Sequence, residues 1–168
     1  MAVVARAAAP HDAAELVRLR ALMFESMGLD TDASVWRGQA RSHLAEHLDC
    51  GLVLGAVVDA PNGAGLAASG LAELSVRIPS PANPSGRSAY LSSFSTDARW
   101  RRRGMARAVL SHVLGQLHDL GVTRVELHAT PDGEPLYRSL GFTERHGGLE
   151  MRLLVAPRRL GRSATASA

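Results

Sequence analysis

The residues best suited to chemistry are a run of arginines in the second half of the chain. All 19 basic residues are arginine, against 16 acidic residues, and the net charge is +3. Five of them fall within residues 99–107, namely Arg99, Arg101, Arg102, Arg103 and Arg107, and without these five the net charge would be negative. One stretch therefore makes the chain basic, and such a stretch is expected to bind an anion.

The same stretch is the turn that leads into a predicted helix. Residues 90–96 favour a strand, and an amphipathic helix begins at Gly104. The first N–H groups of a helix lack partners and carry a partial positive charge, so a turn of this kind can hold a phosphate or pyrophosphate. Gly104 and Ala106 are small enough to let an anion approach the backbone, and the arginines add charge-assisted hydrogen bonds.

Two other interpretations of the arginine run remain open. The Gly-Lys-Ser/Thr ending of a Walker loop and the three-glycine dinucleotide pattern are both absent. A solvated charged loop or a nucleic-acid-binding patch would have a similar composition. Aromatic residues make up only 4% of the chain and no second basic helix extends the run, so we expect no nucleic-acid partner.

Two segments resemble motifs of a known family. Residues 101–106, Arg-Arg-Arg-Gly-Met-Ala, resemble the R/Q-x-x-G-x-G/A signature of the GNAT acyltransferase superfamily, and Trp100 precedes them where an aromatic residue is usual. Residues 136–142, Leu-Tyr-Arg-Ser-Leu-Gly-Phe, resemble the L-Y-x-x-x-G-F segment of the same family. A helix and a strand separate the motifs, two helices and three strands precede them, and the resemblance covers about residues 3–155.

The resemblance implies acetyl-CoA, or another acyl-CoA, as a co-substrate. Its pyrophosphate would lie on the turn, and its pantetheine arm would follow the backbone of the preceding strand and contact residue 130. The implied cofactor-binding residues are Phe94, Ser95, Thr96, Arg101, Arg102, Arg103, Gly104, Met105, Ala106 and Thr130. The chain departs from the family pattern at Thr130, where an Asn is common, and at Ala106, which replaces the second glycine.

The implied reaction is direct acetyl transfer from the thioester to a primary amine in a ternary complex. A backbone N–H near residues 94–96 would stabilise the oxyanion. Tyr137 matches the family's general acid, since a phenol can protonate the departing thiolate, but the position also suits a tyrosine that only packs in the core. Without turnover, the same fold would be a sensor that binds acyl-CoA.

The general base has two candidates. Glu73 interrupts an apolar strand, and a carboxylate buried there would accept the amine proton; the alternative is that it faces solvent. His128 follows the strand after the long helix and would act as base or relay, or as a structural histidine. Water can also carry the proton. Cys50 is interpreted as an inert small residue rather than an acyl carrier.

The acceptor is predicted to be an amine of a small molecule or peptide. Glu25, Asp30 and Asp32 gather where the first two helices join, a region that shapes the acceptor pocket in the resembling family. Acidic side chains there would attract a cationic amine, so Glu25 and Asp30 are the substrate-binding candidates. Helix capping explains Asp30 and Asp32 equally well. The proline-bearing loop 78–88 would form another wall or a lid.

The pattern along the chain predicts an α/β fold with one GNAT-like mixed sheet of six to seven strands and about four helices. Strands are expected at residues 3–8, 52–58, 65–78, 90–96, 122–129, 142–146 and 149–155, and helices near 13–27, 31–50, 104–120 and 131–140. An Asp12–Glu15 capping box is expected to begin the first helix. Residues 1–156 form one domain, and 157–168 are expected to be a disordered tail.

Length and composition exclude several other classes of protein. A chain of 168 residues fits one domain. The longest apolar run, residues 52–58, is far shorter than the ~20 residues of a membrane span, so no membrane partner is expected. Cys50 is the only cysteine, which excludes an internal disulfide and a metal site of cysteine pairs and favours a cytoplasmic location. No metal is predicted, and both monomer and homodimer remain open.

Overall fold

The computed structural model describes residues 3–32 and 34–144, and within these ranges the chain forms one α/β unit. Its strands are β1 (Arg6–Ala7), β2 (Val53–Asp59), β3 (Leu66–Val76), β4 (Arg87–Thr96) and β5 (Arg124–Glu126). Its helices are α1 (Ala13–Ser26), α2 (Ser34–Asp49), α3 (Met105–Asp119) and α4 (Glu134–Arg138). The order of these elements agrees with the sequence-based prediction.

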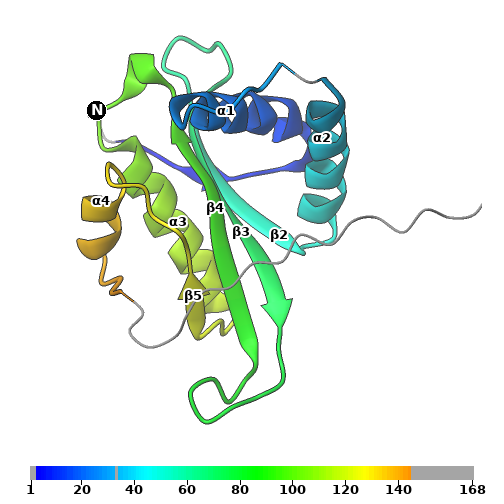
Figure 1. Ribbon diagram of the computed structural model, residues 1–168, viewed down its shortest axis with the longest axis vertical. Helices are drawn as coiled ribbons and strands as arrows, with labels where there is room; N and C mark the ends of the chain where they lie inside the picture. The colour runs from blue at the N-terminus through cyan, green and yellow to red at the C-terminus, as the bar shows by residue number, and fades with distance from the viewer. Residues whose placement is uncertain (1–2, 33, 145–168) are drawn as a thin grey trace, which may run out of the picture.

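The strands form a single mixed sheet in the order β1-β2-β3-β4-β5 (Figure 1). Neighbouring strands are antiparallel except for β4 and β5, which are parallel and joined by α3. The β3–β4 hairpin extends beyond the rest of the sheet, and its connection carries the predicted proline-bearing loop (Figure 1). The parallel crossover brings the start of α3 to the end of β4, where the arginine run lies.

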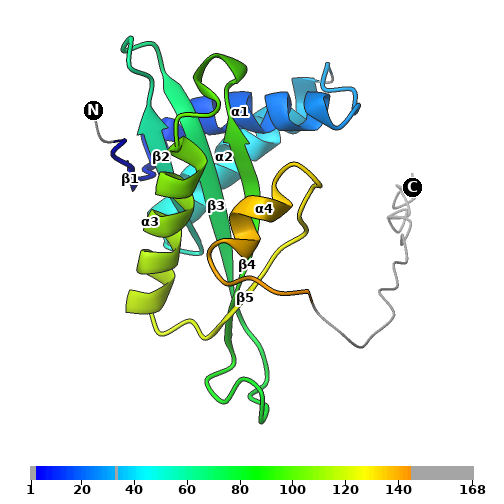
Figure 2. The ribbon, with the colours of Figure 1, turned by 90° about the vertical axis from the view of Figure 1, so that its left-hand side faces the viewer.

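Helices cover both faces of the sheet. Helices α1 and α2 lie on one face, and α3 and α4 lie on the other (Figures 1 and 2). Each face has its own apolar core; α3 contributes the fully buried Val109, Leu110, Val113 and Leu117 to one of them. The spacing of these four side chains matches one side of a helix, which explains why this segment folds as an amphipathic helix against the sheet.

Strand β3 lies at the centre, and small residues allow both helical layers to approach it. Residues 66–72 are all buried, because this part of the strand is covered on both faces. A Cβ atom at Gly70 would lie 2.4 Å from the ring of Phe94 on β4. The absence of a side chain at Gly70 therefore leaves space for the Phe94 ring.

The described part of the chain has five strands, fewer than the six to seven predicted. The strand predicted at 122–129 shortens to β5, because it pairs only with Ser88–Tyr90 of β4. Residues 142–144 are not in a strand. The rest of the predicted final hairpin, 145–155, and the predicted tail, 157–168, lie outside the described residues.

The predicted capping box at the start of α1 is wrong. The Asp12 side chain does not cap the helix. Instead, its carboxylate accepts hydrogen bonds from Arg6 at 2.8 and 2.9 Å and ties the first strand to α1. Glu15 binds Arg18 and the backbone N–H of Leu66. Arginine side chains, and for Glu15 also the distant Leu66 backbone, thus bind both carboxylates in place of the expected cap.

Candidate functional site

One edge of β4 is left open where the strand runs toward the arginine turn. Strand β5 pairs with β4 only from Ser88 to Tyr90, and the ladder stops there. Past this point β4 is distorted: its register against β3 shifts, and Ser93 adopts a positive φ of 55°. The backbone of Phe94, Ser95 and Thr96 therefore has no strand partner on the β5 side in the described structure, as the prediction of a pantetheine-binding edge requires.

The turn after β4 presents a concentration of backbone donors. Arg102 and Gly104 both have a left-handed backbone, with φ of 61° and 79°. Within the described structure, the N–H groups of residues 102–107 donate to no protein acceptor. Consecutive N–H groups around left-handed residues at the start of a helix form an anion-binding concavity. A non-glycine residue with positive φ is strained, and such strain is common at binding sites.

The structure divides the five arginines into two groups. Three bind other parts of the protein: Arg99 binds Asp97, Arg101 donates to the carbonyl of Thr96, and Arg107 donates to Ser139, which directly follows α4. The other two are less constrained. Arg103 stacks on the Trp100 ring at 4.9 Å, and the exposed Arg102 forms no hydrogen bond, ion pair or ring contact with any residue in the described ranges. Arg102 and Arg103 are therefore the side chains best placed to bind an anion.

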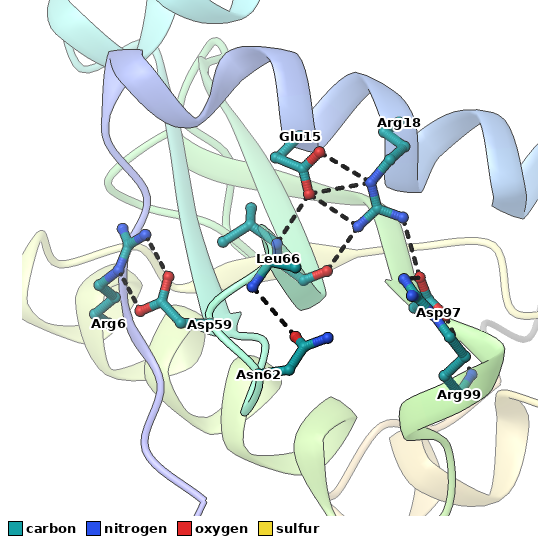
Figure 3. A network of polar contacts seen from close by, with 9 residues as sticks. Arg6, Glu15, Arg18, Asp59, Asn62, Leu66, Asp97 and Arg99 are labelled. Atoms are coloured by element: carbon teal, nitrogen blue, oxygen red, sulfur yellow. Dashed lines mark hydrogen bonds and ion pairs between the residues drawn. The ribbon is translucent and has the colours of Figure 1, made fainter.

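A polar network holds the turn against α1 (Figure 3). The buried Asp97 carboxylate accepts hydrogen bonds from Arg99 at 2.8 Å and from Arg18 of α1 at 3.0 Å. Arg18 also binds Glu15 and the carbonyl oxygen of Leu66. Hydrogen bonding by the Arg99 guanidinium holds the pKa of Asp97 well below its usual range. The carboxylate thus stays charged and connects the turn, β3 and α1.

We expect Asp97→Asn to destabilise the protein by about 2 to 3 kcal/mol at pH 7, because it removes the charge that these hydrogen bonds satisfy. The pKa of Asp97 is lowered in the folded state, so its contribution is present above the ordinary carboxyl pKa and is lost as the pH falls toward the folded value. Urea unfolding at pH 7 and pH 3 measures both effects. The exposed Asp119→Asn is the control, and an equal loss of stability in the two variants would contradict the prediction.

Tyr137 lies on α4, beside the open edge of β4. Its ring makes edge-to-face contacts with Phe94 at 6.1 Å and with Phe142 at 5.7 Å. Burial raises the pKa of the Tyr137 hydroxyl, so this group remains protonated at neutral pH. The contacts fix the ring and leave the phenol chemically suited to donate a proton. The structure thus brings the predicted acid next to the predicted cofactor-binding strand.

Of the two alternatives for Glu73, burial in the strand and exposure to solvent, the structure shows exposure. Glu73 lies in β3 just beyond the covered segment 66–72, and its side chain is exposed. It accepts a hydrogen bond of 2.9 Å from Ser92 of β4. It also lines a cavity of about 240 Å³ on the α1/α2 face of the sheet. The carboxylate therefore faces a space that an acceptor could enter.

His128 follows β5 and contacts the neighbouring strand. Its Nδ1 atom lies 2.7 Å from the hydroxyl of Tyr90 on β4. Tyr90 is in turn the register partner of Glu73 on β3. The two base candidates thus lie on either side of Tyr90, which the sequence did not single out. Thr130 is further along the same segment, and its carbonyl oxygen accepts from Gly133 and Glu134 at the start of α4.

The two acceptor candidates from the first helical connection have local structural partners. Glu25 accepts a hydrogen bond of 2.6 Å from Thr31 and lies 3.7 Å from Arg37. Asp30 accepts from the backbone N–H of Asp32. Neither side chain lines the cavity that Glu73 faces. The residue that does extend from α1 into that cavity is Arg20, which sequence reasoning missed.

The position of Arg20 in the sequence could have identified it as a candidate residue. It lies four residues after the buried Leu16 and four before Phe24, so helical spacing places it on the face of α1 that packs on the sheet. A lone arginine in such a position is buried at a cost unless something binds it.

In residues 3–32 and 34–144, no group of three or more His, Cys, Asp or Glu side chains is arranged to hold a metal ion. In the same ranges, no helix has the length and apolar character needed to cross a bilayer.

Comparison with protein families gives a match over the second half of the fold. Residues 76–151 match the model described as an acetyltransferase (GNAT) domain. The match includes the arginine turn, α3 and the Tyr137 segment. A search of curated protein sequences finds no match.

Solved structures share the fold over nearly the whole chain. A GCN5-related N-acetyltransferase from Ralstonia eutropha superposes with a TM-score of 0.79 at 24% identity, covering 93% of this chain and 100% of the other. A predicted acetyltransferase from Clostridium acetobutylicum, solved with acetyl-CoA, gives 0.78 at 20% identity and covers 90% and 96%. Glucosamine-6-phosphate N-acetyltransferase from Arabidopsis thaliana gives 0.70 at 14% identity and covers 93% and 100%.

Proposed function

We propose that this chain, which carries a GNAT acetyltransferase domain, transfers an acetyl group from acetyl-CoA to a primary amine of a small molecule or peptide. The observation that carries the proposal is the turn at residues 102–107, where unpartnered N–H groups, two left-handed residues and two available arginines converge. A pyrophosphate has the charge and oxygen acceptors that such a turn binds.

The neighbouring elements fit the remainder of an acyl-CoA. From the turn, an extended arm can follow the open edge of β4 along residues 94–96, whose outward N–H and C=O groups offer hydrogen bonds. A backbone N–H of this segment would stabilise the negative charge that develops on the thioester oxygen. Thr130 supplies a hydroxyl near the start of α4 in place of the more common Asn.

The proposed reaction is a direct attack with both substrates bound. The amine nitrogen forms a bond to the carbonyl carbon, and the C–S bond breaks as the tetrahedral intermediate collapses. Tyr137 protonates the departing thiolate, which suits a phenol whose pKa is raised by burial. Holding both substrates in one complex supplies a large part of the acceleration.

The amine proton leaves toward the α1/α2 face of the sheet. Glu73, which faces the cavity there, accepts it directly or through water, and His128 is the second candidate through its contact with Tyr90. This assignment places the acid and the base on opposite sides of β4. The thiolate and the amine then exchange protons with different groups.

Calorimetric titration with acetyl-CoA, followed by a thiol-release assay against a pooled amine library, tests the proposal. We expect micromolar binding and release of free CoA in the presence of at least one class of amine. Binding without release from any amine would favour an acyl-CoA sensor. No binding, together with salt-dependent binding to duplex DNA, would replace the proposal with a nucleic-acid-binding function.

A further inference from the structure

The cavity on the α1/α2 face is lined by one positively and one negatively charged side chain, together with apolar residues. It measures about 240 Å³, and its charged lining residues are Arg20 of α1 and Glu73 of β3. Its apolar lining comes from Ala40 and Leu44 of α2, Val53 of β2 and Leu71 of β3. Cavities for drug-sized ligands measure roughly 300 to 1,000 Å³, so this space suits a smaller molecule.

The Arg20 guanidinium has most of its hydrogen-bonding capacity unused. It donates to the hydroxyl of Ser93 and lies over the Phe24 ring at 4.8 Å. An arginine has five N–H donors, and in the described ranges no other acceptor and no ion-pair partner within 4 Å is present for Arg20. A carboxylate is the ligand that binds such a fork with two parallel hydrogen bonds.

Burial gives this arginine a further reason to bind an anion. Arg20 is half-buried between α1 and the sheet, and desolvation lowers the pKa of its guanidinium, with partial compensation from the charge of Glu73. An anionic group bound at the guanidinium would offset the desolvation. Ser93, which accepts from Arg20, is also the distorted residue of β4, so the bound group would lie beside the open edge of that strand.

The carboxylate of Glu73 provides for a cationic group in the same cavity. Glu73 uses one oxygen to accept from Ser92, and its side chain remains exposed. As an acceptor of protons and hydrogen bonds it matches an ammonium group, which must lose a proton before it can attack the thioester. A cationic side chain, an anionic side chain and apolar side chains therefore line the same small cavity.

We propose that the acceptor is a small α-amino acid with an apolar side chain, its carboxylate bound by Arg20 and its amine directed to Glu73. This inference rests on the proposed acetyl transfer and names its substrate class. The apolar side chain packs among Ala40, Leu44 and Val53. A plain amine fills only part of this cavity and leaves Arg20 unpaired, so amino acids are preferred over amines without a carboxylate.

The first test changes the substrate and leaves the protein intact. Acetylation of L-valine, L-leucine, L-methionine and L-phenylalanine is compared with that of their amides, which keep the shape and lose the carboxylate. We expect at least about a 10-fold preference in kcat/KM for one or more of the acids, about 1.4 kcal/mol. The α-amine of an amino acid amide loses its proton more readily than the α-amine of the free amino acid. A preference for the acid therefore has to come from binding of its carboxylate. Equal or faster reaction of every amide would overturn the inference.

The second test uses Arg20→Gln, with Arg20→Lys as the charge-retaining variant. We expect Arg20→Gln to raise KM for the preferred acid about 10-fold, to leave the amide unchanged, and so to abolish the preference. Arg20→Lys is expected to keep part of it. An equal loss for acid and amide would mean that Arg20 only supports Ser93, and would overturn the inference. Arg41→Gln, an exposed change on α2, is the matched control.

Direct binding separates this inference from the proposed function. The protein with CoA is titrated calorimetrically with the same acids and amides, before and after the Arg20→Gln change. Binding of an acid that Arg20→Gln abolishes supports the cavity assignment even if no acetyl group is transferred. Transfer to other amines with no binding of any of these acids would overturn the inference and leave the proposed function standing.

Discussion

Tyr137→Phe lowers turnover about 10² to 10⁴-fold and leaves the affinity for acetyl-CoA nearly unchanged. The phenylalanine keeps the ring contacts with Phe94 and Phe142 and loses only the hydroxyl. The loss should therefore fall on kcat rather than on stability or binding. Steady-state kinetics and calorimetric titration with acetyl-CoA measure the two quantities on the same preparation.

The pH dependence gives a readout that a purely structural role would not change. Because burial raises the pKa of Tyr137, its hydroxyl is protonated across the neutral range, and the wild-type rate falls only at strongly alkaline pH when this proton is lost. The alkaline limb should disappear in Tyr137→Phe. If the variant turns over at the wild-type rate, Tyr137 only packs α4 against β4, and the proton donor is another group.

Reversing the charge of Arg102 and Arg103 together should weaken acetyl-CoA binding by about 100-fold, close to 3 kcal/mol. These are the arginines of the turn whose side chains are not committed to another part of the described structure by a hydrogen bond. Each charge-assisted hydrogen bond contributes roughly 1.5 to 3 kcal/mol, and glutamate at either position also repels the pyrophosphate. Calorimetric titration of Arg102→Glu/Arg103→Glu measures the loss.

The control for net charge is Arg41→Glu/Arg77→Glu, which alters two exposed arginines away from the turn by the same amount. It should bind acetyl-CoA within about 3-fold of the wild type, since charges more than a Debye length of ~8 Å apart are largely screened at physiological salt. If both double variants lose affinity equally, the turn is not the anion site and overall charge alone attracts the ligand.

Features that depend on neighbouring residues could be predicted from the sequence. The turn at Gly104, the amphipathic α3 and the segment around Tyr137 are each encoded within a few consecutive residues. The resemblance to the GNAT family rested on these segments, and both lie within the residues that match the family model. The roles assigned to the individual site residues remain predictions.

Features that depend on distant contacts could not be predicted. Arg20 and Ser93 are 73 positions apart, and only the packing of α1 on β4 brings them together. The sequence left open whether Glu73 is buried or exposed, because this depends on how far the helices cover β3, and they cover it only as far as Ala72. Asp12 and Glu15 fitted a local cap, yet Asp12 binds Arg6 of β1 and Glu15 accepts from the distant backbone N–H of Leu66.

Two arginines of α1 form hydrogen bonds with residues on either side of the open segment of β4, residues 94–96. Arg18 reaches Asp97 at one end and Arg20 reaches Ser93 at the other. If this segment binds the acyl donor, a shift of α1 would disturb both substrates, which limits how α1 can change during evolution. Helix α2 lines the same cavity through Ala40, His43 and Leu44, and its described side chains form no hydrogen bond or ion pair with β4. New acceptor preferences should therefore arise by substitution in α2, where the walls of the cavity can be reshaped while the donor site is kept.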